Sequence, residues 1–354
     1  MNTITADSTP RPKRPITTGD AALDARVREL VTAAGGDKPR ELIEEMVTTA
    51  LKMALDQTTV ADLKMLNRAL KEMRFASRVF APYRQFRKVS VFGSARTPEE
   101  APESQMAIAF AHEMVQRGWM VITGGGDGIM GAAQKGAGAE NSFGLNIKLP
   151  FEQSANETIK SDRKLMNFNY FFTRKLNFVK ESSAIVLFPG GFGTMDEGFE
   201  ALTLMQTGKA RISPVVFIDK SGGKYWEELL RFLHDHFLGN RLVSQEDFNL
   251  IHHCDSVQCA ADHITHFFSN FHSYRWLGPR LIIRLNHRLS DAHVQHMNTE
   301  FADVLASGKF EQSEALPEEN REPEIAHLPR LVFQPHKRNF GRLRKVLDAV
   351  NDVI

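Results

Sequence analysis

Cysteine is scarce in this sequence, and several other features are missing altogether. Two cysteines, Cys254 and Cys259, are too few for a disulfide framework and suit a reducing compartment. No apolar run is long enough to span a bilayer, and the first residues lack the apolar core of a secretory signal. The formal net charge of +1 gives no global reason to expect a nucleic-acid partner. We therefore expect a cytoplasmic protein that binds neither membranes nor nucleic acid.

Composition and periodicity divide the whole sequence into four parts. Residues 1–19 are rich in Thr, Pro, Arg and Lys and are predicted to be a disordered tail. Residues 20–86 carry apolar side chains at i, i+3 and i+4 spacing, which predicts a helical extension. Residues 87–275 read as the main domain, and residues 276–354 as a small α+β region.

Strand and helix patterns alternate along the main domain. Short apolar runs typical of buried strands occur at residues 88–93, 119–123, 143–149, 184–188 and 214–218, with helical patterns between them. This alternation predicts an α/β fold with a doubly wound, Rossmann-like parallel sheet. Ligands of such sheets bind beyond the carboxyl ends of the strands, where glycine-rich turns are expected here.

One such turn follows the strand at 184–188 and reads Pro189-Gly-Gly-Phe-Gly-Thr194. Its glycines, Gly190, Gly191 and Gly193, allow close backbone approach and positive φ, and the next helix is expected to open at Thr194. Free N–H groups at that helix start would bind an anion, with Glu197 one turn further on. A structural alternative is a capping box in which Thr194 and Glu197 only close the helix end.

A second glycine run, Gly124 to Gly131, contains the spacing G-x-G-x-x-G. The dinucleotide fingerprint also needs an acid about 20 residues on, at the end of the next strand. Here the first acid is Glu152, beyond a proline, which argues against a dinucleotide. Two phosphate-type loops at one crevice suit a mononucleotide instead, although a loop required only for tight packing is the alternative.

Together these motifs resemble the LOG family of nucleoside 5′-monophosphate phosphoribohydrolases. The resemblance covers about residues 88–239 and depends on P-G-G-x-G-T-x-x-E, on G-G-G-x-x-G-x-M-G and on the pair Arg174-Lys175. The family pattern around that pair is H-x-R-K-x-x-M, and phenylalanine replaces both the His and, at Phe178, the Met. The resemblance implies hydrolysis of the N-glycosidic bond of AMP or N6-modified AMP, with Arg174 acting beside Glu197.

The resemblance and the loop chemistry together assign a site. Glu197 and Arg174 are the expected catalytic residues, Glu200 is a candidate partner of Glu197, and Asp127 is only a guess for the acid that protonates the leaving base. This chemistry requires no metal and no cofactor. The residues expected to bind the substrate are Gly93, Ser94, Gly124, Gly125, Gly126, Gly128, Lys175, Gly190, Gly191, Gly193 and Thr194.

Other interpretations stay open. A nucleotide-binding carrier or sensor on the same fold is the main alternative, and an NAD-dependent oxidoreductase is disfavoured by the missing acid. Some family members carry the name lysine decarboxylase, which implies pyridoxal chemistry, but the glycine-motif region lacks the required Schiff-base lysine with a partner for the ring nitrogen.

His252-His-Cys254 with Cys259 matches no standard zinc spacing. The basic run Arg330 to Lys345 is either a phosphate contact or, more simply, a solvated helix face. Family members form dimers or larger oligomers, so a homo-oligomer is expected.

Overall fold

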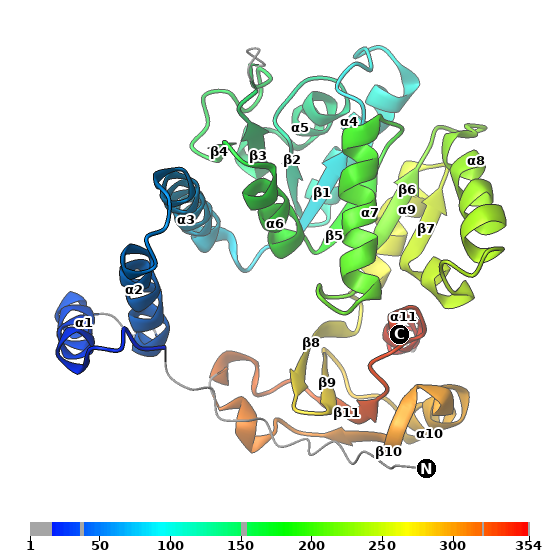
Figure 1. Ribbon diagram of the computed structural model, residues 1–354. Helices are drawn as coiled ribbons and strands as arrows, with labels where there is room; N and C mark the ends of the chain where they lie inside the picture. The colour runs from blue at the N-terminus through cyan, green and yellow to red at the C-terminus, as the bar shows by residue number, and fades with distance from the viewer. Residues whose placement is uncertain (1–15, 36–38, 150–153, 321, 353–354) are drawn as a thin grey trace. The chain divides into compact units, whose positions relative to one another are not determined.

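The computed structural model describes residues 16–35, 39–149, 154–320 and 322–352, which divide into two compact units between Lys71 and Glu72 (Figure 1). The first unit contains helices α1 (Ala21–Ala34) and α2 (Arg40–Leu55), and α3 (Val60–Phe80) begins in it. Asp20 caps α1 by accepting hydrogen bonds from two backbone N–H groups. Most of the predicted tail lies outside the described residues. No described helix has both the length and the apolarity needed to cross a membrane.

The second unit is built on a parallel sheet of seven strands in the order β4-β3-β2-β1-β5-β6-β7 (Figure 1). The strand order reverses between β1 and β5, which are direct neighbours in the centre. The predicted doubly wound, Rossmann-like fold is therefore confirmed, and its ligand crevice is expected at this reversal. The strands are β1 (Lys88–Phe92), β2 (Met120–Thr123), β3 (Ser142–Ile147), β4 (Leu165–Phe168), β5 (Ala184–Leu187), β6 (Val215–Ile218) and β7 (Ile251–Cys254).

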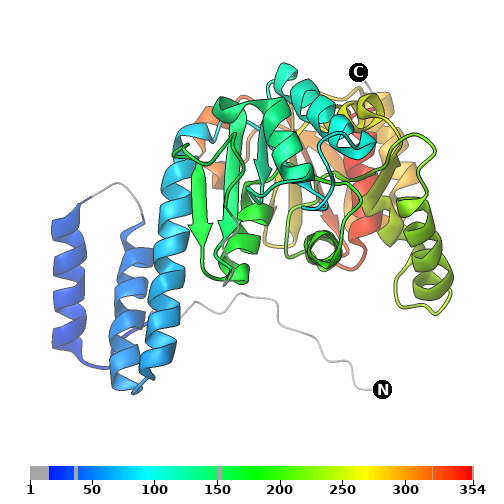
Figure 2. The ribbon, with the colours of Figure 1, turned by 90° about the horizontal axis from the view of Figure 1, so that it is seen from above.

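Helices cover both faces of this sheet (Figures 1 and 2). Alternate residues of β5 belong to different apolar clusters: Ala184 and Val186 pack on one face, Ile185 and Leu187 on the other. The first face is covered by α4 (Pro102–Gln116), α5 (Ile129–Ala137) and α9 (Val257–His266). The second is covered by the end of α3, α6 (Phe171–Glu181), α7 (Phe192–Gln206) and α8 (Tyr225–Phe232).

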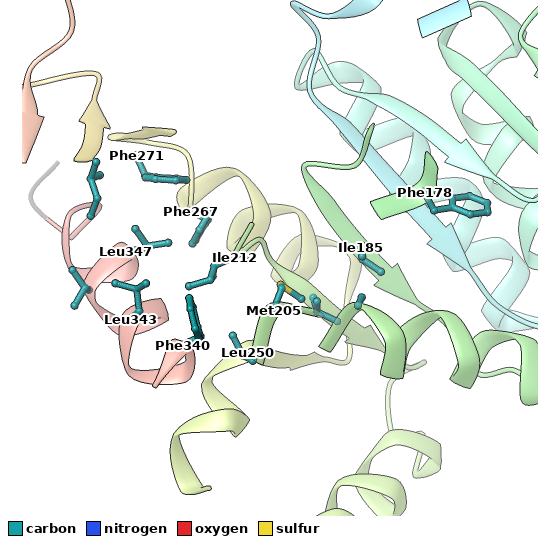
Figure 3. Close-up of a cluster of buried hydrophobic side chains, with 14 of the residues drawn as sticks. Phe178, Ile185, Met205, Ile212, Leu250, Phe267, Phe271, Phe340, Leu343 and Leu347 are labelled. Atoms are coloured by element: carbon teal, nitrogen blue, oxygen red, sulfur yellow. The ribbon is translucent and has the colours of Figure 1, made fainter. Parts of the chain in front are cut away.

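The C-terminal region is a second, antiparallel sheet in the order β10-β11-β9-β8, as expected for an α+β region. One continuous apolar cluster joins it to the main sheet, from Phe178 and Ile185 through Met205 to Leu343 and Leu347 (Figure 3). The elements are β8 (Phe271–Leu277), β9 (Arg280–Leu285), α10 (Asp291–Glu300), β10 (Leu305–Ser313), β11 (Arg330–Pro335) and α11 (Phe340–Ala349).

Two strands of the parallel sheet were not predicted: β4 and β7. Strands β4 and β7 are edge strands of four residues each, and polar residues interrupt their apolar pattern. The periodicity of so short a segment does not distinguish a strand from an irregular loop.

Cys254 and Cys259 form a disulfide, which the sequence analysis did not predict. Cys254 ends β7, and Cys259 lies in the first turn of α9. The imidazole of His252 is beside them, and its ligand atom and both sulfurs lie within 4.8 Å of one another. Since the disulfide occupies both sulfurs, no thiolate is available here to bind a metal.

A buried ion triad stabilises the antiparallel sheet. Glu319 accepts hydrogen bonds from Arg284 on β9 at 2.7 Å and from Arg330 on β11 at 2.8 Å, and all three side chains are at most 5% exposed. Arg344 on α11 is also buried. The expectation that Arg330 to Lys345 form a solvated face is therefore wrong for these two arginines, because their guanidinium groups pair with side chains inside the fold.

Substitution of Glu319 by glutamine is expected to reduce the free energy of unfolding by about 3 kcal/mol, because buried Arg330 loses its carboxylate partner and Arg284 keeps only the more exposed Glu322. The adjacent Glu318 is the matched control, since it is 48% exposed and pairs with an exposed arginine. Its substitution by glutamine is expected to cost less than about 1 kcal/mol. Urea unfolding of both variants measures the difference, and equal midpoints would contradict the structural role of the triad.

Candidate active site

Three loops meet at the carboxyl ends of β1, β2 and β5. Ser94, just after β1, donates its backbone N–H to Pro189 at 3.1 Å and accepts the N–H of Ile129 at 3.0 Å. A Cβ on Gly128 would lie 2.3 Å from the Ser94 carbonyl oxygen, and one on Gly190 would lie 2.2 Å from Oγ1 of Thr194. Only glycine fits at these two positions, so the predicted loops Gly93–Ser94, Gly124–Gly128 and Gly190–Thr194 do converge.

Helix α7 starts at Phe192, two residues earlier than predicted, with Gly191 as its N-cap. Thr194 is therefore inside the first turn and cannot be the N-cap, so the capping-box interpretation of Thr194 and Glu197 is wrong. No side chain caps this helix end. The first N–H groups, those of Phe192 and Gly193, have no partner within their own helix and can bind an anion.

The glycines of this turn do not use the left-handed backbone region. Positive φ occurs instead at Gly125 and Gly128 of the second loop, at +77° and +63°. The expectation of positive φ at Gly190, Gly191 and Gly193 is thus wrong. Space near Gly191 and Gly193 is open, with no atom within 4 Å of a Cβ built on either residue. Their small size leaves room for a ligand directly against the helix start.

Helices α6 and α7 bring Arg174 and Glu197 together. Nη2 of Arg174 lies 3.4 Å from Oε1 of Glu197, with side chains 14% and 6% exposed. The guanidinium carbon also lies 5.0 Å from the ring centre of Phe171 and 5.8 Å from that of Phe178. Nε of Arg174 is buried without an acceptor among the described residues. A buried donor without a partner is costly, and an oxygen of a bound substrate would satisfy it.

Burial determines the charge state of this pair. Burial raises the pKa of Glu197 to about 7, although the positive charges of Arg174 and Lys175 partly oppose the rise. Burial also lowers the pKa of Arg174, although the negative charge of Glu197 partly raises it. Glu197 is consequently poised between its two protonation states near neutral pH, as suits a carboxylate that exchanges a proton during a reaction.

The other acidic and basic residues of the predicted site have different surroundings. Lys175 binds the carboxylates of Asp196 at 2.8 Å and Glu200 at 2.6 Å. Glu200 thus contacts Lys175 directly, and its charge slightly raises the pKa of Glu197. Asp127 is exposed in the loop between β2 and α5. A direct role of Lys175 in binding and of Asp127 as an acid both remain predictions.

Two residues that the sequence analysis missed support the loops. Buried Asn156 donates its side-chain amide to the carbonyls of Gly125 at 3.0 Å and Gly126 at 2.9 Å. Tyr225 donates its hydroxyl to the carbonyl of Gly190. A lone Asn in an irregular stretch and a Tyr at a helix start carry no sequence signal, because their partners lie about 30 residues away.

Buried Glu72 anchors the start of α6. Its carboxylate accepts hydrogen bonds from the backbone and side chain of Asn169, at 2.9 and 2.6 Å, and from the hydroxyl of Thr173 at 2.6 Å. Thr173 directly precedes Arg174. Glu72 therefore helps to fix the helix turn from which the guanidinium reaches Glu197.

Known proteins share the sequence of this region. A family model described as "Possible lysine decarboxylase" matches residues 130–264. A probable cytokinin riboside 5′-monophosphate phosphoribohydrolase of Oryza sativa subsp. japonica is 30% identical over 154 residues, which are 42% of this chain and 60% of the rice protein. A cytokinin riboside 5′-monophosphate phosphoribohydrolase of Arabidopsis thaliana is 28% identical over 153 residues, or 42% of this chain and 68% of the plant protein.

Solved structures of lower similarity include a molybdenum cofactor carrier protein from Chlamydomonas reinhardtii. It is 22% identical and has a TM-score of 0.36, with 51% of this chain and 97% of that chain covered.

The fold and the site define a class of protein: a Rossmann-like α/β protein with two glycine loops and a buried carboxylate–guanidinium pair at the reversal of strand order. The family-model match and the curated relatives go further. Over this region the chain is similar in sequence to the LOG-type phosphoribohydrolases of plants.

Proposed function

We propose that the protein is a nucleoside 5′-monophosphate phosphoribohydrolase that acts on AMP or N6-modified AMP. The products would be the free base and ribose 5-phosphate. The observation that carries this proposal is the buried pair Arg174–Glu197 beside an uncapped helix start. The names of the plant relatives support the same reaction class.

The proposed binding mode places the 5′-phosphate at the start of α7. The N–H groups of Phe192 and Gly193, the hydroxyl of Thr194 and the helix dipole would hold it there. The loop from Gly124 to Gly128 and the residues Gly93 and Ser94 would contact the sugar and base. Arg174 offers its unpartnered Nε to a ribose or phosphate oxygen.

In the proposed reaction, water attacks the anomeric carbon as the bond to the base nitrogen breaks. The electron pair of that bond leaves with the base, which then takes up a proton. The transition state resembles a ribosyl cation, as in glycoside hydrolysis. The carboxylate of Glu197 would stabilise this positive charge or remove a proton from the attacking water.

The phosphate requirement tests this binding mode. AMP is expected to have a kcat/KM at least about 100-fold above that of adenosine, because binding energy from the remote phosphate orients the reacting centre. Chromatography of adenine released from each compound measures the ratio. Equal rates would contradict the phosphate role of the α7 start, and no release from either would contradict the enzymatic proposal.

A second candidate function is a non-catalytic nucleotide carrier or sensor. The exposed loops and open helix start would serve binding equally well. The buried carboxylate of Glu197 favours the enzyme, since binding an anionic nucleotide gains nothing from a negative charge beside it. Recovery of unchanged AMP from a complex with the protein would favour this second function.

We also propose a homodimer formed through helices of the main domain. Large apolar side chains on α6 and α7 are exposed to solvent, with Phe172 and Leu176 53% and Phe192 96% exposed. Exposed large apolar side chains often mark an interface, and two-fold symmetry is the usual arrangement. Light scattering is expected to give twice the chain mass of 39.9 kDa. The mass of one chain at micromolar concentration, with full activity, would contradict the dimer.

A further inference from the structure

A cavity of about 500 Å³ lies at the edge of the main sheet opposite to the glycine loops. Lys88, the first residue of β1, lines it, whereas the proposed active site follows the last residues of the same strand. The rest of the wall includes the loop before β1, the start of β5, the ends of α6 and α7, the loop before β6 and the start of β8. The cavity is therefore separated from the glycine loops by the length of the strands.

The charges in this cavity are almost all positive. Its cations are Arg84, Arg87, Lys88, Lys180, Lys209 and Arg211, and its one carboxylate is Glu181. Glu181 pairs with Lys180 at 2.6 Å. For the other five cations, no carboxylate of the described chain lies within ion-pair distance. The cavity thus holds a strong excess of positive charge in a chain whose net charge is only +1.

Two of these cations are shielded from solvent, since Lys88 is buried and Arg87 is half-buried. The guanidinium carbon of Arg87 lies 3.7 Å from the ring centre of Phe268, and Nη2 donates to the carbonyl of His272 at 3.4 Å. Nζ of Lys88 donates to the carbonyls of Tyr83 at 2.8 Å and Phe86 at 3.0 Å. Burial lowers the pKa of Arg87 to about 10, so the group is still charged at neutral pH. Buried cations are costly without a counter-charge, and a bound anion would supply one.

The remaining wall is apolar or aromatic. Ile185, Met205, Ile212 and Phe271 line the cavity and are drawn in Figure 3. The rings of Phe86 and Tyr274 add flat surfaces. The volume falls in the range of small-molecule sites, which combine apolar walls with a few charged groups. A macromolecular anion would need an open surface, whereas this cavity suits a compact ligand.

We propose that this cavity is a second ligand site that binds a nucleoside polyphosphate. Five unpaired cations exceed what one phosphate group needs, and guanidinium groups recognise phosphate oxygens by paired hydrogen bonds. The aromatic and apolar wall would receive the nucleoside. The site lies against the distal parts of α6 and α7, the two helices that carry Arg174 and Glu197, so its occupant is an effector of the proposed reaction.

Calorimetric titration of the full-length protein with ATP, tripolyphosphate and inorganic phosphate tests the binding site. The rim variant combines Lys209→Ser and Arg211→Ser, at two exposed residues that line the cavity. The matched control combines Lys309→Ser and Lys345→Ser, which are exposed and lie outside the cavity. ATP is expected to bind the unmodified protein and the control equally, and the rim variant at least about tenfold more weakly.

Three results would overturn the proposal: no binding of ATP to the unmodified protein, equal affinity of the rim and control variants, or equal affinity for ATP and tripolyphosphate. The last would exclude a nucleoside subsite.

The effector role depends on the proposed function and is tested separately, by AMP turnover with and without saturating ATP. The effector role is supported if ATP changes kcat or KM of the control variant but not of the rim variant. Unchanged turnover despite ATP binding would contradict the effector role, while lack of all turnover would contradict the proposed function and leave the titration valid.

Discussion

The Glu197→Gln variant is expected to hydrolyse AMP at least about a thousandfold more slowly than the unmodified protein while still binding AMP. The amide keeps the shape of the side chain and can accept a hydrogen bond from Arg174. It carries no negative charge to stabilise a ribosyl cation and cannot take a proton from water. Single-turnover chromatography gives the rate, and calorimetry gives the affinity for AMP.

The matched control is Glu200→Gln, on the same helix. Glu200 contacts Lys175 rather than Arg174, so its loss is expected to change kcat less than about tenfold, or ~1.4 kcal/mol in barrier. If Glu197→Gln also retains activity within tenfold, the carboxylate of Glu197 has only a structural role. If both variants lose AMP binding together, the comparison reports damage to the helix start.

The pH dependence of kcat/KM is expected to follow the ionisation of Glu197. Burial raises its pKa to about 7, and the reaction needs the carboxylate. Activity is therefore expected to fall tenfold per pH unit below about 7 and to level off above it. The sign would be reversed if Glu197 acted as the acid that protonates the leaving base.

Arg174 provides the control for this assignment. Its positive charge lowers the pKa of Glu197, so Arg174→Gln is expected to move the acidic limb to higher pH as well as reduce kcat. The 5′-phosphate of AMP also titrates near pH 6, but its ionisation in free substrate does not respond to a protein substitution. If the acidic limb of the kcat/KM profile stays at the same pH in the Arg174→Gln variant, it reflects ionisation of the substrate phosphate and not of Glu197.

The sequence predicted the parts of this protein that depend on local pattern. Buried runs such as Ala184–Leu187 marked the central strands, and the order of strands and helices gave the fold class. Glycines marked the loops because close approach to another backbone, as at Gly128 and Ser94, excludes any side chain. The same pattern misplaced the start of α7, since Phe192 and Gly193 look like turn residues until the helix geometry is known.

Contacts between distant segments were not predictable. The hydrogen bonds from Asn156 to the glycine loop and from Glu72 to α6 join residues that no local pattern relates. The cationic cavity likewise brings together Lys88, Lys180 and Arg211 from separate elements, each of which looks like an ordinary surface residue in the sequence. The resemblance to a family supplied Arg174, which composition alone would have assigned to a solvated helix face.

The origin of the oxygen in the sugar product tests the central claim most directly. The protein is incubated with AMP in water enriched in ¹⁸O, and the products are examined at once by mass spectrometry. Hydrolysis at the anomeric carbon predicts free adenine and ribose 5-phosphate that carries one ¹⁸O atom from the solvent. Unchanged AMP, or adenosine with labelled inorganic phosphate, would contradict the account.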